Sequence, residues 1–199
     1  MNHKSGNSEG FLSNEVVYFV TSNVHKFLEA RKVLFQYNIS ATKLKVEAIE
    51  IQDDHLENIA KYSVLDAIKK CGSPVFVEDA GLFIESLNGF PGPYSKYVLQ
   101  TVGLNGVLKL MDGINNRNAY FKSVICYGGP KEEPTCFVGK VEGKISSELH
   151  GDSGFGYDPI FVPSEGDGRT FAEMSLTEKN SYSHRARALK QFAEWYSSR

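Results

Sequence analysis

The sequence predicts an α/β fold in which helices pack against a sheet. Over residues 15–77, apolar runs of strand length alternate with segments whose apolar residues recur at helical spacing, in the order strand, helix, strand, helix, strand. Hydrophobic residues make up 41% of the 199 positions, which is enough for a substantial core. Parallel and mixed sheets are both compatible with this order of elements.

The first half of the chain supplies five elements. Residues 15–21 (EVVYFVT) read as a buried strand, and residues 24–37 carry an apolar face at helical spacing. Residues 43–51 alternate as a second strand, residues 56–68 suit a second helix, and residues 75–77 give a third strand. Each strand is short and apolar enough to lie inside a sheet.

The second half begins with a loop, NGFPGP at residues 88–93, whose glycines and prolines interrupt regular structure. Residues 94–111 look helical, with a break near Gly103. Residues 119–127 and 136–145 then predict an antiparallel pair of strands joined by a loop rich in glycine and proline.

A last helix follows Ser183, which can cap it, because Ala186, Leu189 and Phe192 fall on one face. No internal repeat or flexible linker divides residues 15–199, so we expect one domain there. Residues 1–14 are polar and lack the apolar core of a signal peptide, which predicts a disordered leader.

Composition narrows the class of protein. A formal net charge of −2 provides no general field for nucleic acid or a membrane surface, and no apolar run is long enough to span a bilayer. Cys71, Cys126 and Cys136 fit neither a disulfide framework nor a zinc site, which predicts reduced thiols and a cytoplasmic location. An anionic ligand would therefore be held by a local site.

TSNVHK, residues 21–26, lies where the first strand becomes the first helix. The positive end of the helix dipole favours an anion there, and Thr21, Ser22, Asn23 and Lys26 add donors. The glycine spacing of a Walker A loop is missing, so a helix cap with a surface lysine is the alternative.

Glu78 and Asp79 place two adjacent carboxylates at the end of an apolar run. Burying them unpaired would be costly, and alternation along a strand sends only one of them into a given site. Glu50, near the end of the second predicted strand, could join Asp79 in a site for Mg²⁺, which prefers carboxylate, water and phosphate oxygens. A solvated turn after the strand is the alternative.

Two further stretches could contact a base. GFGYDPIF, residues 154–161, holds an aromatic ring between glycines, and such a ring can stack on a nucleobase or simply fill the core beside a tight turn. EKNSYSHR, residues 178–185, sets Lys179, His184 and Arg185 around the start of the last helix. By itself this second stretch could be only a charged cap.

Taken together in order and spacing, the motifs resemble the inosine/xanthosine triphosphate pyrophosphatase family, most closely its archaeal-type members. The resemblance runs through TSNVHK, EIQ, VEDAGLFIESLNGFPGPYSKYV, NRNAYFKSVI, GFGYDPIFVP, TFAEM and EKNSYSHRARAL. It implies an elongated α/β fold with two lobes, a mixed sheet with flanking helices and a central cleft. It also implies a homodimer that hydrolyses non-standard purine nucleoside triphosphates to monophosphate and pyrophosphate.

The resemblance further implies a role for each motif. Asp79 would bind Mg²⁺ and activate the water that attacks the α-phosphorus, with Glu50 as the second metal carboxylate. Thr21, Ser22, Asn23, Val24, His25 and Lys26 would hold the triphosphate, with Ala80 nearby. The base and sugar would contact Phe155, Gly156, Tyr157, Asp158, Lys179, His184 and Arg185.

Three positions depart from the pattern of that family. Ala80 replaces a serine of many bacterial relatives, and Ser22 replaces a glycine, which would strain a loop that needs a positive φ. Ser63 stands where several relatives carry a lysine that touches the phosphates. Lys61 lies two residues earlier, a rotation of about 200° along a helix, so it would face the wrong way.

Two rival functions are a Maf-like pyrophosphatase acting on pyrimidine or modified nucleotides, and a nucleotide-binding sensor that performs no chemistry. The SHR and GFGYD stretches favour the purine enzyme over the first, and Glu50, Asp79 and Lys179 argue against the second.

Overall fold

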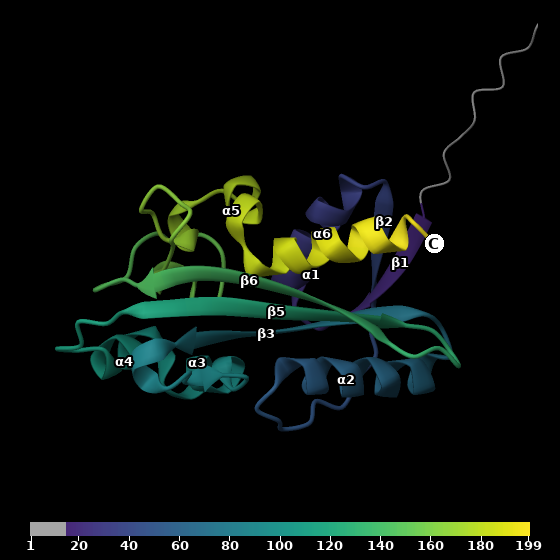
Figure 1. The fold of residues 1–199 in the computed structure, drawn as a ribbon, viewed down its shortest axis with the longest axis horizontal. Coiled ribbons are helices and arrows are strands. Elements are labelled where there is room, and N and C mark those ends of the chain that lie inside the picture. Colours follow the sequence, from purple (N-terminus) through teal and green to yellow (C-terminus); the bar gives the residue numbers. More distant parts are fainter. Residues whose placement is uncertain (1–14) are drawn as a thin grey trace, which may run out of the picture.

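The computed structural model of the protein describes residues 15–199, so the predicted leader at residues 1–14 lies outside the described part. It confirms the α/β class and the mixed sheet. Within residues 15–199, seven strands form one sheet in the order β2-β1-β3-β5-β6-β7, with β4 paired to β3 (Figure 1).

The amino-terminal half builds the parallel part of the sheet. β1 (Glu15–Val20) pairs in parallel with β2 (Ile39–Leu44) on one side and with β3 (Val75–Ile84) on the other. α1 (Val24–Phe35) and α2 (Leu56–Cys71) are the crossovers between these strands, as the helix-strand alternation predicts.

The rest of the sheet is antiparallel. β3 pairs with β5 (Asn118–Gly128) from Val75 to Ile84, and β5 pairs with β6 (Thr135–Ile145). Short strands β4 (Pro91–Gly92) and β7 (Phe161–Pro163) pair with β3 and β6 respectively. The three long strands therefore connect the two ends of the elongated molecule (Figure 1).

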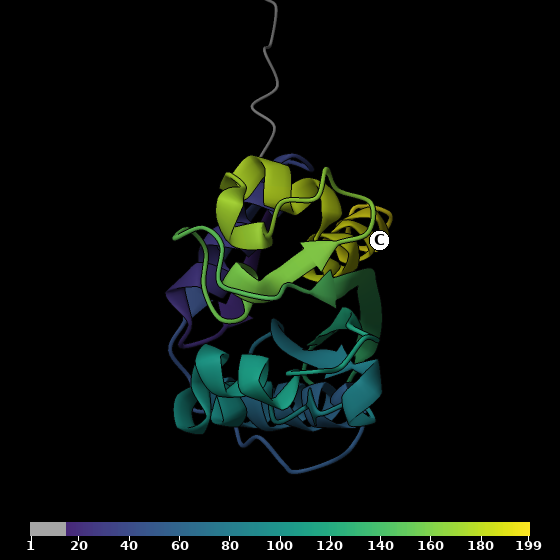
Figure 2. The same ribbon diagram turned by 90° about the vertical axis from the view of Figure 1, so that its left-hand side faces the viewer.

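Helices cover both faces of the sheet. α2, α3 (Ser95–Thr101) and α4 (Gly103–Leu110) lie on one side, and α1, α5 (Leu176–Tyr182) and α6 (His184–Tyr196) lie on the other (Figures 1 and 2). Short 3₁₀ turns occur at Glu85–Leu87, Asp158–Ile160 and Phe171–Glu173. None of the helices in residues 15–199 is long and apolar enough to cross a membrane.

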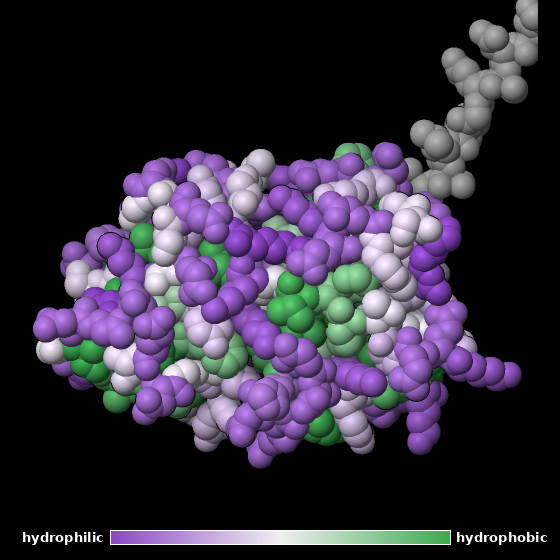
Figure 3. All heavy atoms as spheres, viewed as in Figure 1, coloured by the Kyte–Doolittle hydropathy of each residue, from purple (hydrophilic) through white to green (hydrophobic). Residues whose placement is uncertain are grey.

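Three apolar clusters hold these layers. One joins α1 and α6 to β1 around Phe19, Phe76 and Phe192, and a second packs α2 on β3 and β5. A third, around Phe161 and Phe171, fills the end of the molecule near α3 and α4. Polar side chains cover most of the surface in Figure 3, with an apolar area between α6 and α2 where β5 and β6 run.

Two predicted strands have different bounds in the structure. The third strand does not end at Val77 but continues to Ile84, because β5 pairs with it along its whole length and satisfies its backbone groups. The second strand is Ile39–Leu44 rather than 43–51, since it begins opposite Glu15 and ends opposite Val20. Residues 45–55 form an irregular loop.

The prediction of three reduced thiols is wrong for two of them. Cys126 and Cys136 form a disulfide, and only Cys71 is free in the described residues. The two cysteines occupy directly opposed positions in the β5–β6 ladder, with Cα atoms 4.1 Å apart. Only the strand register brings them together, which the spacing along the chain does not show.

Candidate active site

A cleft of about 670 Å³ opens beside the centre of the sheet. Its walls come from the start of α1, the 45–55 loop, β3, α3, the loop around Phe155, and the α5–α6 junction. Most of the predicted site residues line it: Thr21, Ser22, Asn23, Lys26, Glu50, Asp79, Ala80, Phe155, Gly156, Tyr157, Asp158, Lys179, His184 and Arg185. Val24 and His25 do not form part of this lining.

The start of α1 forms one end of the cleft. Asn23 caps the helix, and its side-chain oxygen accepts hydrogen bonds from the N–H groups of His25 at 2.9 Å and Lys26 at 3.2 Å. Two of the first N–H groups of α1 are therefore bonded within the helix cap. Ser22 does not adopt a positive φ, so the expected strain at that position is absent.

Glu78 and Asp79 are neighbours in β3, so their side chains leave the strand in opposite directions. Glu78 is buried, and its carboxylate meets Lys26 Nζ at 2.9 Å, Arg185 Nε at 3.1 Å and Ser123 Oγ at 2.5 Å. Burial alone would raise the pKa of Glu78, but the charges of Arg185 and Lys26 outweigh burial and hold the pKa far below its usual value. Glu78 therefore stays ionised and orients two cations.

Asp79 is more accessible and faces the cleft. Burial chiefly raises its pKa to about 6; Lys26 opposes the rise, and the carboxylates of Glu78 and Glu50 add to it. Its Oδ1 accepts a hydrogen bond from the Ala80 N–H at 2.9 Å. A carboxylate with this pKa can exchange a proton near neutral pH.

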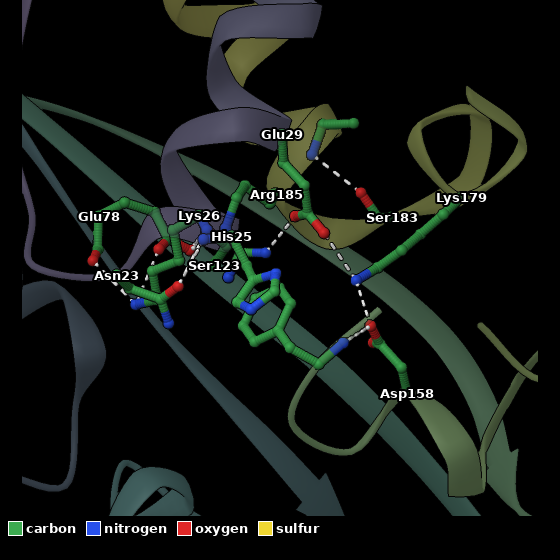
Figure 4. Close-up of polar contacts among 12 residues, drawn as sticks. Asn23, His25, Lys26, Glu29, Glu78, Ser123, Asp158, Lys179, Ser183 and Arg185 are labelled. Carbon is green, nitrogen blue, oxygen red and sulfur yellow. Dashed lines mark hydrogen bonds and ion pairs between the residues drawn. The ribbon is translucent and has the colours of Figure 1, made fainter. Parts of the chain in front are cut away.

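A second group of charges lies under the opposite end of the cleft (Figure 4). Lys179 Nζ lies 2.7 Å from Glu29 Oε1 and 2.6 Å from Asp158 Oδ2, and Arg185 pairs with the other oxygen of Glu29. The side chains of these four residues are at most 4% exposed. Asp158 also accepts a hydrogen bond from the Phe155 N–H at 2.8 Å, which fixes the aromatic loop.

Glu78 links this group to Lys26, so the charges form one connected set. We call it the charge network, and it consists of Lys26, Glu29, Glu78, Asp158, Lys179 and Arg185. Sequence reasoning missed Glu29. One sequence signal could have identified it. Glu29 is an acidic residue one helical turn from both Lys26 and Val33, so it lies on the face of α1 that packs on the core.

The Phe155 ring sits between two glycines with positive φ, Gly154 at 75° and Gly156 at 68°. The His25 imidazole stacks on it, with ring centroids 5.1 Å apart and planes at 15°. Lys179 Nζ lies 4.7 Å from the ring centroid. His25, which the resemblance assigns to the triphosphate, thus contacts Phe155, which the resemblance assigns to the base.

The start of α6 presents backbone donors. Ser183 caps the helix by accepting from the Ala186 N–H, as predicted. In the described residues, the N–H groups of His184 and Arg185 make no hydrogen bond with another protein group. The His184 ring is buried against Phe121, and burial first, then the nearby Arg185, lowers its pKa, so the imidazole is neutral.

Ser63 and Lys61, the two positions that the sequence left open, lie in different surroundings. Ser63 is buried and lines the cleft, and its Oγ donates to the Ile49 carbonyl at 3.1 Å. Lys61 is exposed, and its Nζ lies 3.6 Å from Glu133 Oε2. Of these two residues, only Ser63 lines the cleft.

Comparison with known proteins decides the family, since the profile of the Ham1 family matches residues 17–195. The chain belongs to the Ham1 family. Among its relatives, a dITP/XTP pyrophosphatase of Methanopyrus kandleri is 49% identical over 180 residues, covering 90% of this chain and 95% of the relative. A dITP/XTP pyrophosphatase of Thermococcus kodakarensis is 51% identical over 177 residues, covering 89% and 95%.

Solved Ham1 structures share the fold. The HAM1 protein of Coxiella burnetii superposes with a TM-score of 0.82 at 29% identity, covering 93% of this chain and all of that one (100%). The Ham1 protein of Staphylococcus aureus gives a TM-score of 0.79 at 27% identity, covering 92% and 99%. The family resemblance that the motifs suggest is confirmed.

Proposed function

We propose that the protein hydrolyses non-canonical purine nucleoside triphosphates such as ITP, dITP and XTP to the monophosphate and pyrophosphate. The observation that carries this function is a single cleft with chemistry at one end and recognition at the other. Asp79, with its pKa near 6, lies at the phosphate end, and Phe155 over Lys179 lies at the base end. The dITP/XTP pyrophosphatases among its Ham1 relatives support the same activity.

The triphosphate binds at the start of α1. Thr21, Ser22 and Lys26 line this end, and the Lys26 side chain is 20% exposed beside Glu78, so its ammonium can turn toward a distal phosphate. The base stacks on Phe155 after His25 leaves the ring. The protein thus orients the α-phosphorus near Asp79 without a glycine-rich loop.

Glu50 and Asp79 fit a divalent cation, which we propose is Mg²⁺. Both line the cleft, and the charge of Glu50 contributes to the raised pKa of Asp79, so the two carboxylates lie close enough to repel. Within residues 15–199, no three acidic, histidine or cysteine side chains form a closed metal cage. That suits Mg²⁺, which keeps water and substrate phosphate among its ligands.

When bound, Mg²⁺ would offset the triphosphate charge and stabilise the leaving pyrophosphate. Asp79 holds a water in line with the α-phosphorus and accepts one of its protons. The water oxygen bonds to the α-phosphorus as the bond to the α,β-bridging oxygen breaks, and pyrophosphate leaves. The Asp79 proton then returns to solvent.

Backbone donors select the base. A hypoxanthine or xanthine 6-keto oxygen accepts hydrogen bonds from the free N–H groups of His184 and Arg185, whereas the adenine 6-amino group would present a donor to donors. An unmet buried polar group costs roughly 1–3 kcal/mol, and sites built on hydrogen bonds discriminate strongly. Guanine keeps the keto oxygen, so its 2-amino group must meet another wall of the pocket.

The test is kcat/KM for ITP, dITP, XTP, ATP, GTP and dUTP with Mg²⁺, measured as pyrophosphate release. We expect ITP or XTP to exceed ATP by at least ~100-fold. Asp79→Asn should lower kcat at least ~100-fold with the fold intact. Comparable values for ATP and ITP would refute the purine selectivity, a preference for dUTP would favour a Maf-like enzyme, and no turnover would favour a sensor.

We also propose a homodimer and a cytoplasmic location. The apolar area over β5 and β6 in Figure 3 supports the first, because burying such a surface favours association, and light scattering tests it. The nucleotide substrate supports the second. Thiol titration of natively purified protein tests the location, and a fully oxidised Cys126–Cys136 pair would count against the cytoplasm.

A further inference from the structure

Glu50 lies on a loop with no regular structure of its own. The loop occupies residues 45–55, between β2 and α2, and Figure 1 shows the chain before α2 passing close to that helix. A metal-binding carboxylate must be held in a narrow range of positions to contribute to affinity. The structure therefore has to fix Glu50 by contacts from outside the loop.

Apolar packing does not fix the residue before Glu50. Val46, Ala48 and Ile51 pack against the cluster under α2, but the Ile49 side chain is 50% exposed. The Ile49 backbone is held by hydrogen bonds instead. Asp66 Oδ2 accepts from the Ile49 N–H at 2.9 Å, and Ser63 Oγ donates to the Ile49 carbonyl at 3.1 Å.

These two bonds act on the peptide groups that lead into Glu50. The Ile49 carbonyl belongs to the peptide plane that joins Ile49 to Glu50, so Ser63 restricts the backbone just before the carboxylate. Ser63 and Asp66 lie three residues apart on one face of α2, which is a rigid support. Lys70 pairs with Asp66 at 2.8 Å and donates to the Glu47 carbonyl at 2.6 Å, a separate tie to the same loop.

We propose that Ser63 and Asp66 are positioning residues that hold the carboxylate of Glu50 at the cation site by bonding both polar groups of the Ile49 backbone. This inference rests on the proposed function of Glu50. The Ser63 hydroxyl is short and donates to the Ile49 carbonyl, so it acts on the loop backbone that carries Glu50.

The test uses Mn²⁺ alone as the probe, with its binding to the full chain followed by electron paramagnetic resonance. Outer groups that orient metal ligands typically account for a 10–100-fold change in affinity. We expect Ser63→Ala and Asp66→Ala, which each remove one of the two bonds to Ile49, to raise the Kd for Mn²⁺ roughly 10-fold and to raise the Mg²⁺ concentration for half-maximal activity in parallel. KM for ITP at saturating Mg²⁺ should change less than about twofold, because neither side chain contacts the substrate.

Two matched variants separate positioning from general loosening. Ser63→Thr keeps the hydroxyl and should keep the Kd within about twofold of the parent. Val46→Ala trims a side chain that packs the same loop against the cluster under α2 but takes part in neither Ile49 bond, so its Kd should also stay within about twofold. An equal loss in Val46→Ala would assign the effect to loop order in general and overturn the proposal.

Glu50→Gln tests the cation site separately from the positioning role of Ser63 and Asp66. If Glu50→Gln weakens Mn²⁺ binding while Ser63→Ala and Asp66→Ala do not, the positioning proposal is wrong and the cation site stands. If Glu50→Gln leaves Mn²⁺ binding unchanged, or the parent protein binds no Mn²⁺, the cation site itself is wrong and the positioning role is refuted with it.

Discussion

Replacing Asp79 by asparagine should stabilise the metal-free protein at neutral pH even as it removes activity. Burial first, and then the charges of Glu78 and Glu50, raise the Asp79 pKa from 3.8 to about 6 against the opposing effect of Lys26. The folded state therefore favours the protonated carboxyl, and stability is lost as pH rises from 3.8 through 6. At about 1.36 kcal/mol per pKa unit, the loss approaches roughly 3 kcal/mol above pH 7.

Asparagine avoids this loss because it carries no charge, and its amide oxygen can still accept the Ala80 N–H. For a chain of this size we expect Asp79→Asn to raise Tm by roughly 6–12 °C at about pH 8 in EDTA, with most of the gain lost near pH 4. Calorimetry of parent and variant across this range measures it. Added Mg²⁺ should raise the Tm of the parent and leave that of the variant unchanged.

Asp53→Asn is the matched control in the same cleft. Hydrogen bonds from the His55 N–H and the Asn58 amide lower the Asp53 pKa, so the charged form is favoured and its removal should give no gain. A Tm of Asp79→Asn at or below that of the parent at about pH 8 would refute the reasoning that the cleft destabilises its own carboxylate.

Three further predictions concern neighbouring positions. Lys26→Ala should weaken ITP binding more than IMP binding in calorimetric titrations, because only the triphosphate reaches the start of α1; equal weakening would remove Lys26 from the phosphate site. Glu29→Gln should lower the free energy of unfolding by ~3–5 kcal/mol in urea, since it leaves two buried cations short of a partner. Gly139→Ala should cost ~1–3 kcal/mol and raise KM for ITP, because its Cβ would lie 2.0 Å from the His184 carbonyl oxygen; an unchanged KM would show that α6 need not sit so close to β6.

The fold was largely predictable because local patterns and global structure agree. The apolar faces of α1, α2 and α6 follow helical spacing, and the Ser183 cap lies where its residue type predicts. The length of β3 was not predictable, since Glu78 and Asp79 resemble a strand end. What keeps them in a strand is pairing with β5, whose residues lie about forty positions away in the chain.

The motifs that form the site could be predicted from the sequence, but the pairs of side chains that contact each other within it could not. Most of the motif residues reach one cleft, but the contacts among them depend on which side chains the fold brings face to face. Glu29 met Lys179 only through the packing of α1 against α5 and α6. The same holds for two other contacts. His25 stacks on Phe155, and Cys126 forms a disulfide with Cys136, because the fold brings them together and no sequence pattern marks either pair.

The charge network contains three cationic and three anionic side chains, so its formal charge is zero before any nucleotide arrives. In evolutionary terms this makes the charge network a single heritable unit. A change at Glu29 alone leaves Lys179 and Arg185 poorly paired in a buried place, and a change at Lys179 alone does the same to Asp158. New base preferences should therefore arise through paired substitutions, and such pairs should covary among Ham1 sequences.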